Sequence, residues 1–155
     1  MKLLLKVLVF TIIVPGTVAG YIPYVLLPAG FVSRAEGLAV AGALPMGLGA
    51  AIYAWCVWDF AVAGRGTPAP IDPPQALVIR GLYRHVRNPM YVGVTLVLLG
   101  ESALFRSLPL LIYASVVASG FHLFVVLHEE PALRRRFGAA YEEYCQAVPR
   151  WIPKA

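Results

Sequence analysis

Two short polar clusters in the second half of the chain carry residue types that can hold a charged ligand. Residues 84–91 read Arg-His-Val-Arg-Asn-Pro-Met-Tyr, and residues 128–130 read His-Glu-Glu. Asn88-Pro89 predicts a capped helix start, whose free backbone N–H groups favour an anionic or acceptor group beside the fixed charge of Arg84 and Arg87. A carboxylate at the Glu129-Glu130-Pro131 kink can take up a cationic amine or ribose hydroxyls. Adjacent helical residues diverge by about 100°, so we expect at most one Glu to face a cleft.

Positive groups on one side and a carboxylate on the other suit a zwitterion with a flat polar base, such as S-adenosylmethionine. Two structural alternatives stay open. The first is a capped helix whose arginines bind lipid headgroups, and the second is a solvated Glu pair that offsets the positive charge of the arginines at 134–136. We find no Gly-x-Gly-x-x-Gly after a strand, no P-loop and no His/Cys metal cluster, so no metal is predicted. Cys56 and Cys145 are interpreted as free thiols.

Apolar helices must position these clusters, because the chain is 59% hydrophobic and only 14% charged, with a mean hydropathy of +0.73. We predict an all-α polytopic membrane bundle with four transmembrane helices at about 3–28, 38–62, 89–104 and 107–127. The last two form a hairpin, so both polar clusters return to one membrane face. Residues 1–155 are predicted to form one domain, in which 1–63 hold the first two spans and 64–155 the cofactor-binding half.

Proline and glycine mark local features within this plan. Pro15 and Pro23 should kink the first span, which we read as an uncleaved helix rather than a signal peptide. Gly42, Gly47 and Gly49 should permit close helix contact. Residues 64–74 carry four prolines and two glycines, which cannot continue a helix; this stretch is a plain linker or a stiff loop over a site. Ser107-Leu108-Pro109 predicts a tight turn between the last two spans.

Residues 131–147 predict a C-terminal amphipathic helix that lies at the interface or packs on the bundle. Its apolar face is formed by Leu133, Phe137, Ala140, Tyr141, Tyr144 and Val148. Basic residues gather before span one, between spans two and three, and after span four, so the positive-inside rule places both termini and both clusters in the cytoplasm. We therefore attribute the net charge of +5 to contact with anionic membrane lipids and to membrane orientation, and not to binding of nucleic acid. Ala/Arg/Gly/Pro-rich usage hints at a bacterial inner membrane, and nothing indicates an oligomeric state.

The chain resembles the isoprenylcysteine carboxyl methyltransferase family, which is related to phospholipid methyltransferases, over roughly residues 64–153. The resemblance rests on Arg87-Asn88-Pro89-Met90-Tyr91-Val92-Gly93, Glu129-Glu130, Phe137-Gly138, Tyr141, Tyr144 and Val148-Pro149. It implies an integral-membrane enzyme that uses S-adenosylmethionine. By position, the implied cofactor contacts are Gln75, Ala76, Leu77, Val78, Tyr83, Asn88, Pro89, Met90, Tyr91 and Glu129, with Arg87 shaping their surroundings.

Two positions depart from the family pattern. Asn88 stands where the family usually has His, and it keeps a donor and an acceptor but does not titrate near neutral pH. His85, at a different position, is a candidate to take the place of that His. Val125 stands where eukaryotic members have an arginine that binds the substrate carboxylate, four residues before Glu129. This departure argues against a prenylcysteine substrate.

We therefore predict a methyltransferase that acts on a lipophilic small molecule or lipid, by carboxylate O-methylation or amine N-methylation. An amine acceptor needs a base, for which His122, His128 and Glu130 are candidates; a carboxylate acceptor needs none. His122 is alternatively a core histidine bonded to a neighbour, and Glu101 is either functional or paired with Arg106. The alternatives are a nicotinamide-dependent membrane reductase related to sterol reductases and a non-enzymatic lipid-binding protein.

Overall fold

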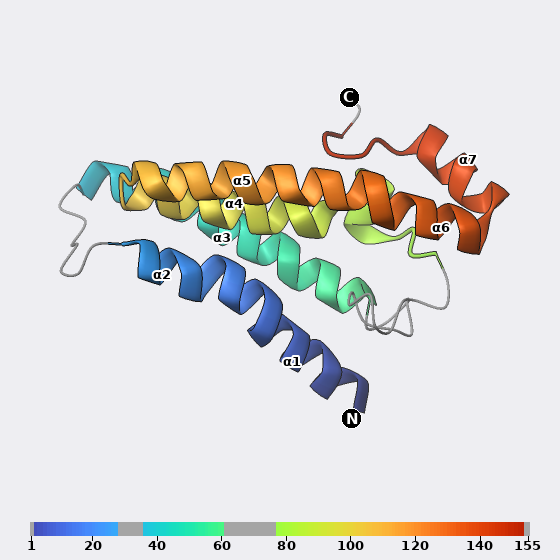
Figure 1. Cartoon of the computed structure of the whole chain (residues 1–155), viewed down its shortest axis with the longest axis horizontal. Coiled ribbons are helices and arrows are strands. Elements are labelled where there is room, and N and C mark those ends of the chain that lie inside the picture. The colour runs from blue at the N-terminus through green and yellow to red at the C-terminus, as the bar shows by residue number, and fades with distance from the viewer. Residues whose placement is uncertain (1, 28–35, 61–76, 154–155) are drawn as a thin grey trace.

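A computed structural model describes residues 2–27, 36–60 and 77–153, and all regular elements in these ranges are helical. This confirms the all-α class for the described part of the chain. Figure 1 shows an elongated bundle in which the N-terminal helix crosses the others at an angle. The main helices are α1 (Lys2–Gly16), α2 (Ile22–Leu26), α3 (Glu36–Asp59), α4 (Pro89–Leu104), α5 (Leu108–Phe124), α6 (Glu130–Phe137) and α7 (Ala139–Ala147).

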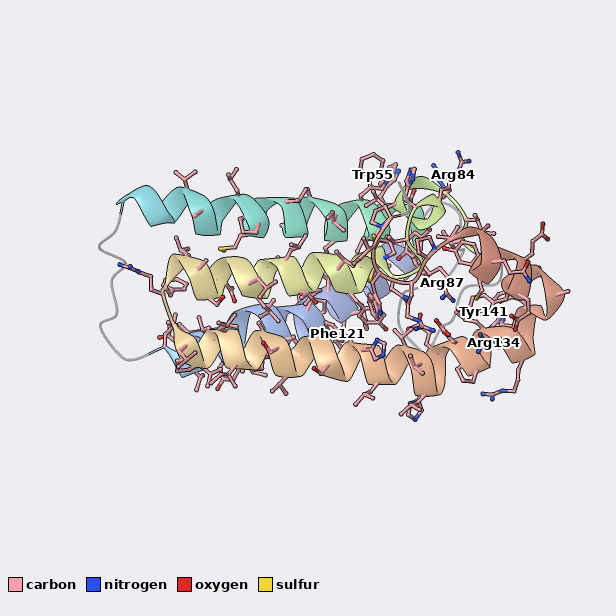
Figure 2. All side chains as sticks on the ribbon, turned by 90° about the horizontal axis from the view of Figure 1, so that it is seen from above. Trp55, Arg84, Arg87, Phe121, Arg134 and Tyr141 are labelled. Carbon is pink, nitrogen blue, oxygen red and sulfur yellow. The ribbon has the colours of Figure 1, made fainter. Side chains whose placement is uncertain are left out.

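Within the described residues, three helical stretches are long and apolar enough to cross a membrane. They are Val7–Leu26, Val40–Asp59 and Leu108–Phe137. The expected third span, α4, has 16 residues, or about 24 Å at the rise of an α-helix, against a hydrocarbon core of about 30 Å. It lies between α3 and α5 (Figure 2). The count of four transmembrane helices therefore stays a prediction.

The first span is one unbroken helical run through Pro15 and Pro23, with a π-helical turn at Thr17–Tyr21 between the prolines. This run packs against α5, where the Tyr113 hydroxyl donates a 2.9 Å hydrogen bond to the carbonyl oxygen of Val18. The kink expected at the prolines thus takes the form of one wider helical turn. In this turn the carbonyl oxygen of Val18 is available to α5.

Close contact between α3 and α4 depends on glycines from both helices. A Cβ at Gly49 would collide with the carbonyl oxygen of Gly93, and a Cβ at Gly42 would lie 2.6 Å from the backbone nitrogen of Leu104. The prediction is confirmed for these two positions. It is wrong for Gly47, where an added Cβ would meet nothing within 4 Å, because that residue faces away from α4.

The turn between α4 and α5 is as tight as expected. Ser107 caps α5, because its hydroxyl oxygen accepts a hydrogen bond from the backbone nitrogen of Leu110. Arg106 before it has a φ of +48°. The two helices consequently run antiparallel, and the residues before α4 and after α5 meet at the same end of the bundle (Figure 2).

The predicted separate helix over 131–147 is wrong at its start and in its interior, whereas its end at Ala147 is confirmed. Helix α5 continues through a π-helical turn at Val125–Glu129 into α6, so Pro131 does not break the chain direction. In this wider turn the Glu130 backbone nitrogen bonds to the carbonyl oxygen of Val125, five residues back, which accommodates a proline in the next helical turn. The break comes instead at Gly138.

Gly138 has a φ of +53° and a ψ of −127°, a conformation that favours glycine because it has no Cβ. It ends α6 and lets α7 turn back along the bundle (Figure 1). The predicted apolar face forms in spite of the break, because Tyr141, Tyr144 and Val148 make a buried cluster with Leu133 and Phe137. Ala140 is exposed and does not take part. A position at the membrane interface stays a prediction for this region.

Candidate functional site

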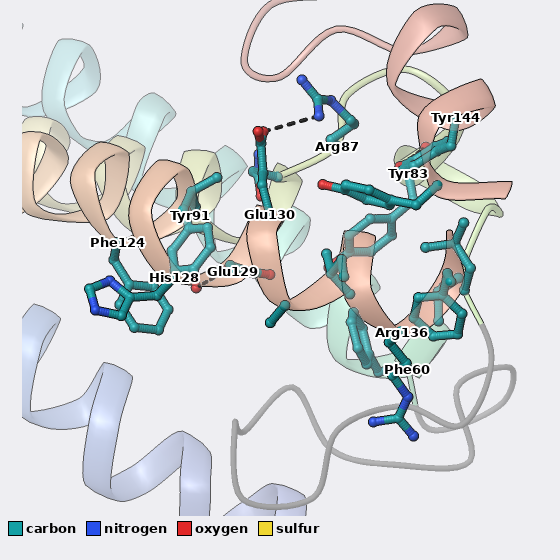
Figure 3. Close-up of a pocket in the computed structure, with 18 residues that line it drawn as sticks. Phe60, Tyr83, Arg87, Tyr91, Phe124, His128, Glu129, Glu130, Arg136 and Tyr144 are labelled. Carbon is teal, nitrogen blue, oxygen red and sulfur yellow. Dashed lines mark hydrogen bonds and ion pairs between the residues drawn. The ribbon is translucent and has the colours of Figure 1, made fainter. Parts of the chain in front are cut away.

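A cavity of about 490 Å³ lies at the end of the bundle where the two polar clusters meet (Figure 3). Its walls come from the turn before α4, the start of α4, the α5–α6 helix, α7 and the end of α3. The lining residues are mostly apolar or aromatic, with a few polar groups. Seven of the predicted cofactor contacts line it: Leu77, Val78, Tyr83, Arg87, Asn88, Tyr91 and Glu129.

Tyr91 and Glu129 join the two clusters directly. The Tyr91 hydroxyl donates a 2.9 Å hydrogen bond to Oε2 of Glu129, and the Tyr91 ring packs on Phe121 with centroids 4.7 Å apart. The Thr95 hydroxyl donates to the Tyr91 carbonyl oxygen one helical turn on. The tyrosine therefore holds the orientation of a carboxylate that lines an apolar cavity, which is the arrangement that selects a cationic or hydroxyl-bearing ligand.

Tyr83 is fixed by contacts on three sides. It is buried beside Cys56, its ring meets Phe60 edge-on at 5.5 Å, and its carbonyl oxygen accepts a 2.6 Å hydrogen bond from the Tyr144 hydroxyl. Burial raises the pKa of Tyr83 well above its usual range. Its hydroxyl therefore stays protonated at physiological pH, and Tyr83 provides an aromatic wall rather than a base.

The turn that carries Tyr83 is attached to the end of α3. Arg80 Nε lies 3.1 Å from Oδ1 of Asp59, a side chain only 2% exposed. Gly81 next to it has a φ of +54°, and a Cβ there would collide with the Asp59 carboxylate. The 3₁₀ turn Gly81–Arg84 follows at once. The ion pair and the glycine together set the position of Tyr83 relative to α3.

Glu130 also lines the cavity, so the expectation that at most one glutamate would do so is wrong. Glu130 lies on the side of Arg87 (Figure 3). Its Oε1 lies 3.0 Å from Arg87 Nη1 and 2.7 Å from Arg150 Nε, and its Oε2 accepts from Arg150 Nη2 at 3.0 Å. The hydrogen bond with Glu130 raises the pKa of Arg150. Ion pairing of this kind disfavours Glu130 as a catalytic base.

Asn88 fastens the C-terminal tail instead of capping α4, so the predicted side-chain cap is wrong. Its Nδ2 donates to the carbonyl oxygen of Arg150 at 3.2 Å, while the Arg87 backbone nitrogen donates to that of Pro149 at 2.9 Å. The tail crosses close to the start of α4, so the Asn88 side chain bonds to the tail and not to the first backbone N–H groups of α4. Pro89 does begin α4, as predicted.

Two predicted cofactor contacts in the described part of the chain, Pro89 and Met90, fall outside the cavity lining. Pro89 is fully buried as the first residue of α4, and Met90 packs toward α3 against the cluster of Cys56, Val78 and Tyr83. Gln75 and Ala76, like the loop at 64–74, lie outside the described residues.

The two histidine candidates differ in position. His128 lines the cavity, with its ring stacked on Phe124 at 5.6 Å. His122 is an exposed residue of α5 rather than a core histidine, and its Nδ1 accepts a 3.1 Å hydrogen bond from Trp151 Nε1. Only His128 therefore faces the cavity as a candidate base.

Several lining residues were not predicted as site residues: Phe60, Phe124, Val125, Ala132, Leu133, Arg136, Phe137, Tyr141 and Tyr144. Most were assigned to a span or to the apolar face of the last helix, where their spacing already had an explanation. Glu101 keeps a buried Oε2 without a hydrogen-bond partner in the described structure, and no ion pair joins it to Arg106 there. The described residues contain no group of three or more His, Cys, Asp or Glu able to hold a metal.

Comparison with known proteins places this chain in a family. The family model for phospholipid methyltransferases matches residues 38–140, which include α3, the Tyr83 turn, α4, α5 and α6. The chain belongs to the phospholipid methyltransferase family. This family, together with the apolar helices, supports an integral membrane protein.

A curated relative gives the same indication as the family. Over 77 residues the chain is 36% identical to the protein-S-isoprenylcysteine O-methyltransferase of Schizosaccharomyces pombe. The match covers 50% of this chain and 33% of that relative, so the chain spans about a third of the length of the curated relative it matches. No solved structure matches. The resemblance drawn from the sequence motifs is confirmed.

Proposed function

We propose that this protein is an integral-membrane methyltransferase that transfers a methyl group from S-adenosylmethionine to a lipophilic or lipid acceptor. The observation that carries the proposal is the Tyr91–Glu129 hydrogen bond in a cavity next to Arg87. Ligand pockets of about 300–1,000 Å³ suit small molecules and cofactors, and this cavity of about 490 Å³ is of that size.

The charged groups of the cavity fit a zwitterionic cofactor. Arg87 has a side chain 10% exposed, and its Nε is a buried donor without a hydrogen-bond partner. That donor suits the carboxylate of the cofactor. Glu129 uses Oε2 for Tyr91, which leaves Oε1 for ribose hydroxyls or a cationic group. Tyr83 and Phe60 offer ring surfaces for a flat base.

S-adenosylmethionine supplies an electrophilic methyl group on a sulfonium. The residues of this chain orient the two reactants and exclude water, which supplies much of the acceleration for an in-line displacement. A carboxylate acceptor needs no base. For an amine acceptor, His128 is the histidine that lines the cavity and would receive the proton. We infer that the cavity opens on the cytoplasmic side, because basic residues cluster in the sequence segments next to those that line the cavity.

Equilibrium binding separates this function from its alternatives. The purified wild-type protein in detergent is titrated with S-adenosylmethionine and, in parallel, with NADPH, by calorimetry. We expect saturable binding of S-adenosylmethionine only. Binding of NADPH alone would favour a membrane reductase, and binding of neither would favour a non-enzymatic lipid-binding protein; both results would overturn the proposal.

A further inference from the structure

Among the described residues, one of the two arginines that line the cavity has no carboxylate beside it. Arg87 and Arg136 are the arginines that line the cavity. Arg87 is paired with Glu130 at 3.0 Å, whereas Arg136 has no acidic group within 4.0 Å among the described residues. Its neighbour Arg134 is also paired, with Glu142 at 2.8 Å. The guanidinium of Arg136 contacts the Phe137 ring, 5.7 Å from its centroid.

Arg136 and Glu129 lie on the same side of one continuous helix. They are seven positions apart, which is roughly two helical turns or about 10 Å along the axis. Both line the cavity, with the apolar residues Ala132 and Leu133 between them. Figure 3 shows Arg136 on the opposite side of the cavity from Arg87 and Glu130. The cavity thus has a second charged end, distinct from the groups assigned to the cofactor.

The remaining lining of the cavity is suited to an apolar chain. Val125 lies on the same side of the helix and is 1% exposed, and Phe124 beside it is 40% exposed on the outer surface of α5. A chain that lies along this wall passes from Arg136 to the lipid-facing side of the bundle. A guanidinium with no acidic partner among the described residues, together with the apolar wall behind it, complements an amphiphile with an anionic head.

We infer that Arg136 is the specificity-determining residue for the methyl acceptor, because its guanidinium binds a carboxylate or a phosphate group of the acceptor. This inference rests on the proposed function. A guanidinium binds a carboxylate or a phosphate through paired N–H donors, so the binding probes must distinguish between these two groups.

The test uses two pairs of probes that differ only in charge. N-acetyl-S-farnesylcysteine is compared with its carboxamide, and farnesyl phosphate with farnesol, by equilibrium binding to the protein in nanodiscs of neutral phosphatidylcholine. The wild type is compared with Arg136→Gln and Arg136→Lys. Arg135→Gln is the matched control, because Arg135 is also exposed on α6 but does not line the cavity.

We expect the wild type to prefer one or both anionic probes over their neutral partners. Arg136→Gln should lose about tenfold in affinity for the anionic probe and little for the neutral one, while Arg136→Lys retains part of the preference and Arg135→Gln retains all of it. Equal loss in Arg135→Gln would assign the effect to the surface charge of α6, and unchanged affinity in Arg136→Gln would also overturn the inference.

Binding of S-adenosylmethionine is measured on the same samples. We expect Arg136→Gln to bind it as the wild type does, and a matching loss would place Arg136 in the cofactor site instead. A wild type that prefers anionic probes but binds no S-adenosylmethionine would refute the proposed function and leave the anion site standing.

Discussion

Tyr91 near the start of α4 donates its hydroxyl hydrogen to Glu129 in the π-helical turn that follows α5, at a distance of 2.9 Å and across 38 positions of sequence. The bond connects the two polar clusters that the apolar hairpin brings to one end of the bundle. It sets the direction of a carboxylate at the wall of the cavity, and this carboxylate is the centre of the proposed cofactor site.

Removing either member of this pair should weaken cofactor binding to different degrees. Tyr91→Phe removes one hydrogen bond, and we expect the Kd for S-adenosylmethionine to rise about two- to tenfold. Glu129→Gln removes the charge as well and should raise the Kd about 10- to 100-fold. Calorimetry measures both. Glu143→Gln on the exposed side of α7 is the control and should match the wild type; a wild-type Kd in Glu129→Gln would contradict the assignment.

Glu130 should matter for stability more than for chemistry. It compensates Arg87 and Arg150, and its side chain is 4% exposed. Glu130→Gln leaves two cations near the cavity with their charge uncompensated, so we expect a loss of about 3–5 kcal/mol in unfolding free energy. Thermal unfolding in detergent gives the change. Glu142→Gln breaks an exposed pair with Arg134 and removes no partner of Glu130, so it should cost less than about 1 kcal/mol. Equal losses for the two variants would refute this role.

The α3–α4 contact should tolerate no side chain at Gly49. Gly49→Ala places a Cβ against the backbone of Gly93, and we expect a destabilisation of about 1–3 kcal/mol or more. Gly47→Ala, two residues earlier, meets open space and should be neutral or stabilising by up to about 1 kcal/mol, since alanine is the better helix former. A melting temperature unchanged in Gly49→Ala would contradict the close packing.

The reversal at Gly138 should be needed to place α7 over the cavity. Gly138→Ala forces a Cβ onto a backbone with φ +53°, so we expect a loss of about 1–3 kcal/mol, together with weaker binding of S-adenosylmethionine as Tyr144 shifts from Tyr83. Thermal unfolding and calorimetry measure the two effects. Gly120→Ala, in a helical conformation with nothing within 4 Å of its Cβ, serves as the control and should show neither.

The hairpin made much of the site predictable. The two apolar stretches have similar lengths, so Tyr91 and Glu129 had to return to the same end, and their contact follows from that geometry. The apolar spacing of Tyr141, Tyr144 and Val148 likewise predicted a buried face, because residues three and four positions apart lie on the same side of a helix.

Long-range competition for polar groups was not predictable from local patterns. Asn88 reads as a helix cap, but the tail that returns after Gly138 brings the Arg150 carbonyl oxygen to it. Arg150 itself was counted as a topology signal, and nothing local marks it as the partner of Glu130. Gly47 and Gly49 are equivalent as sequence, and only the orientation of α3 separates them.

Methyl transfer by the cavity variants tests the central claim most directly. Membranes that contain wild-type protein, Glu129→Gln or Glu143→Gln receive methyl-labelled S-adenosylmethionine together with carboxylate, phosphate and amine amphiphiles, and the label in the organic extract is measured. We expect labelled product from the wild type and Glu143→Gln, and at least about tenfold less from folded Glu129→Gln. Equal labelling by Glu129→Gln, or no labelled product from the wild type with any of these acceptors, would contradict methyl transfer at this site.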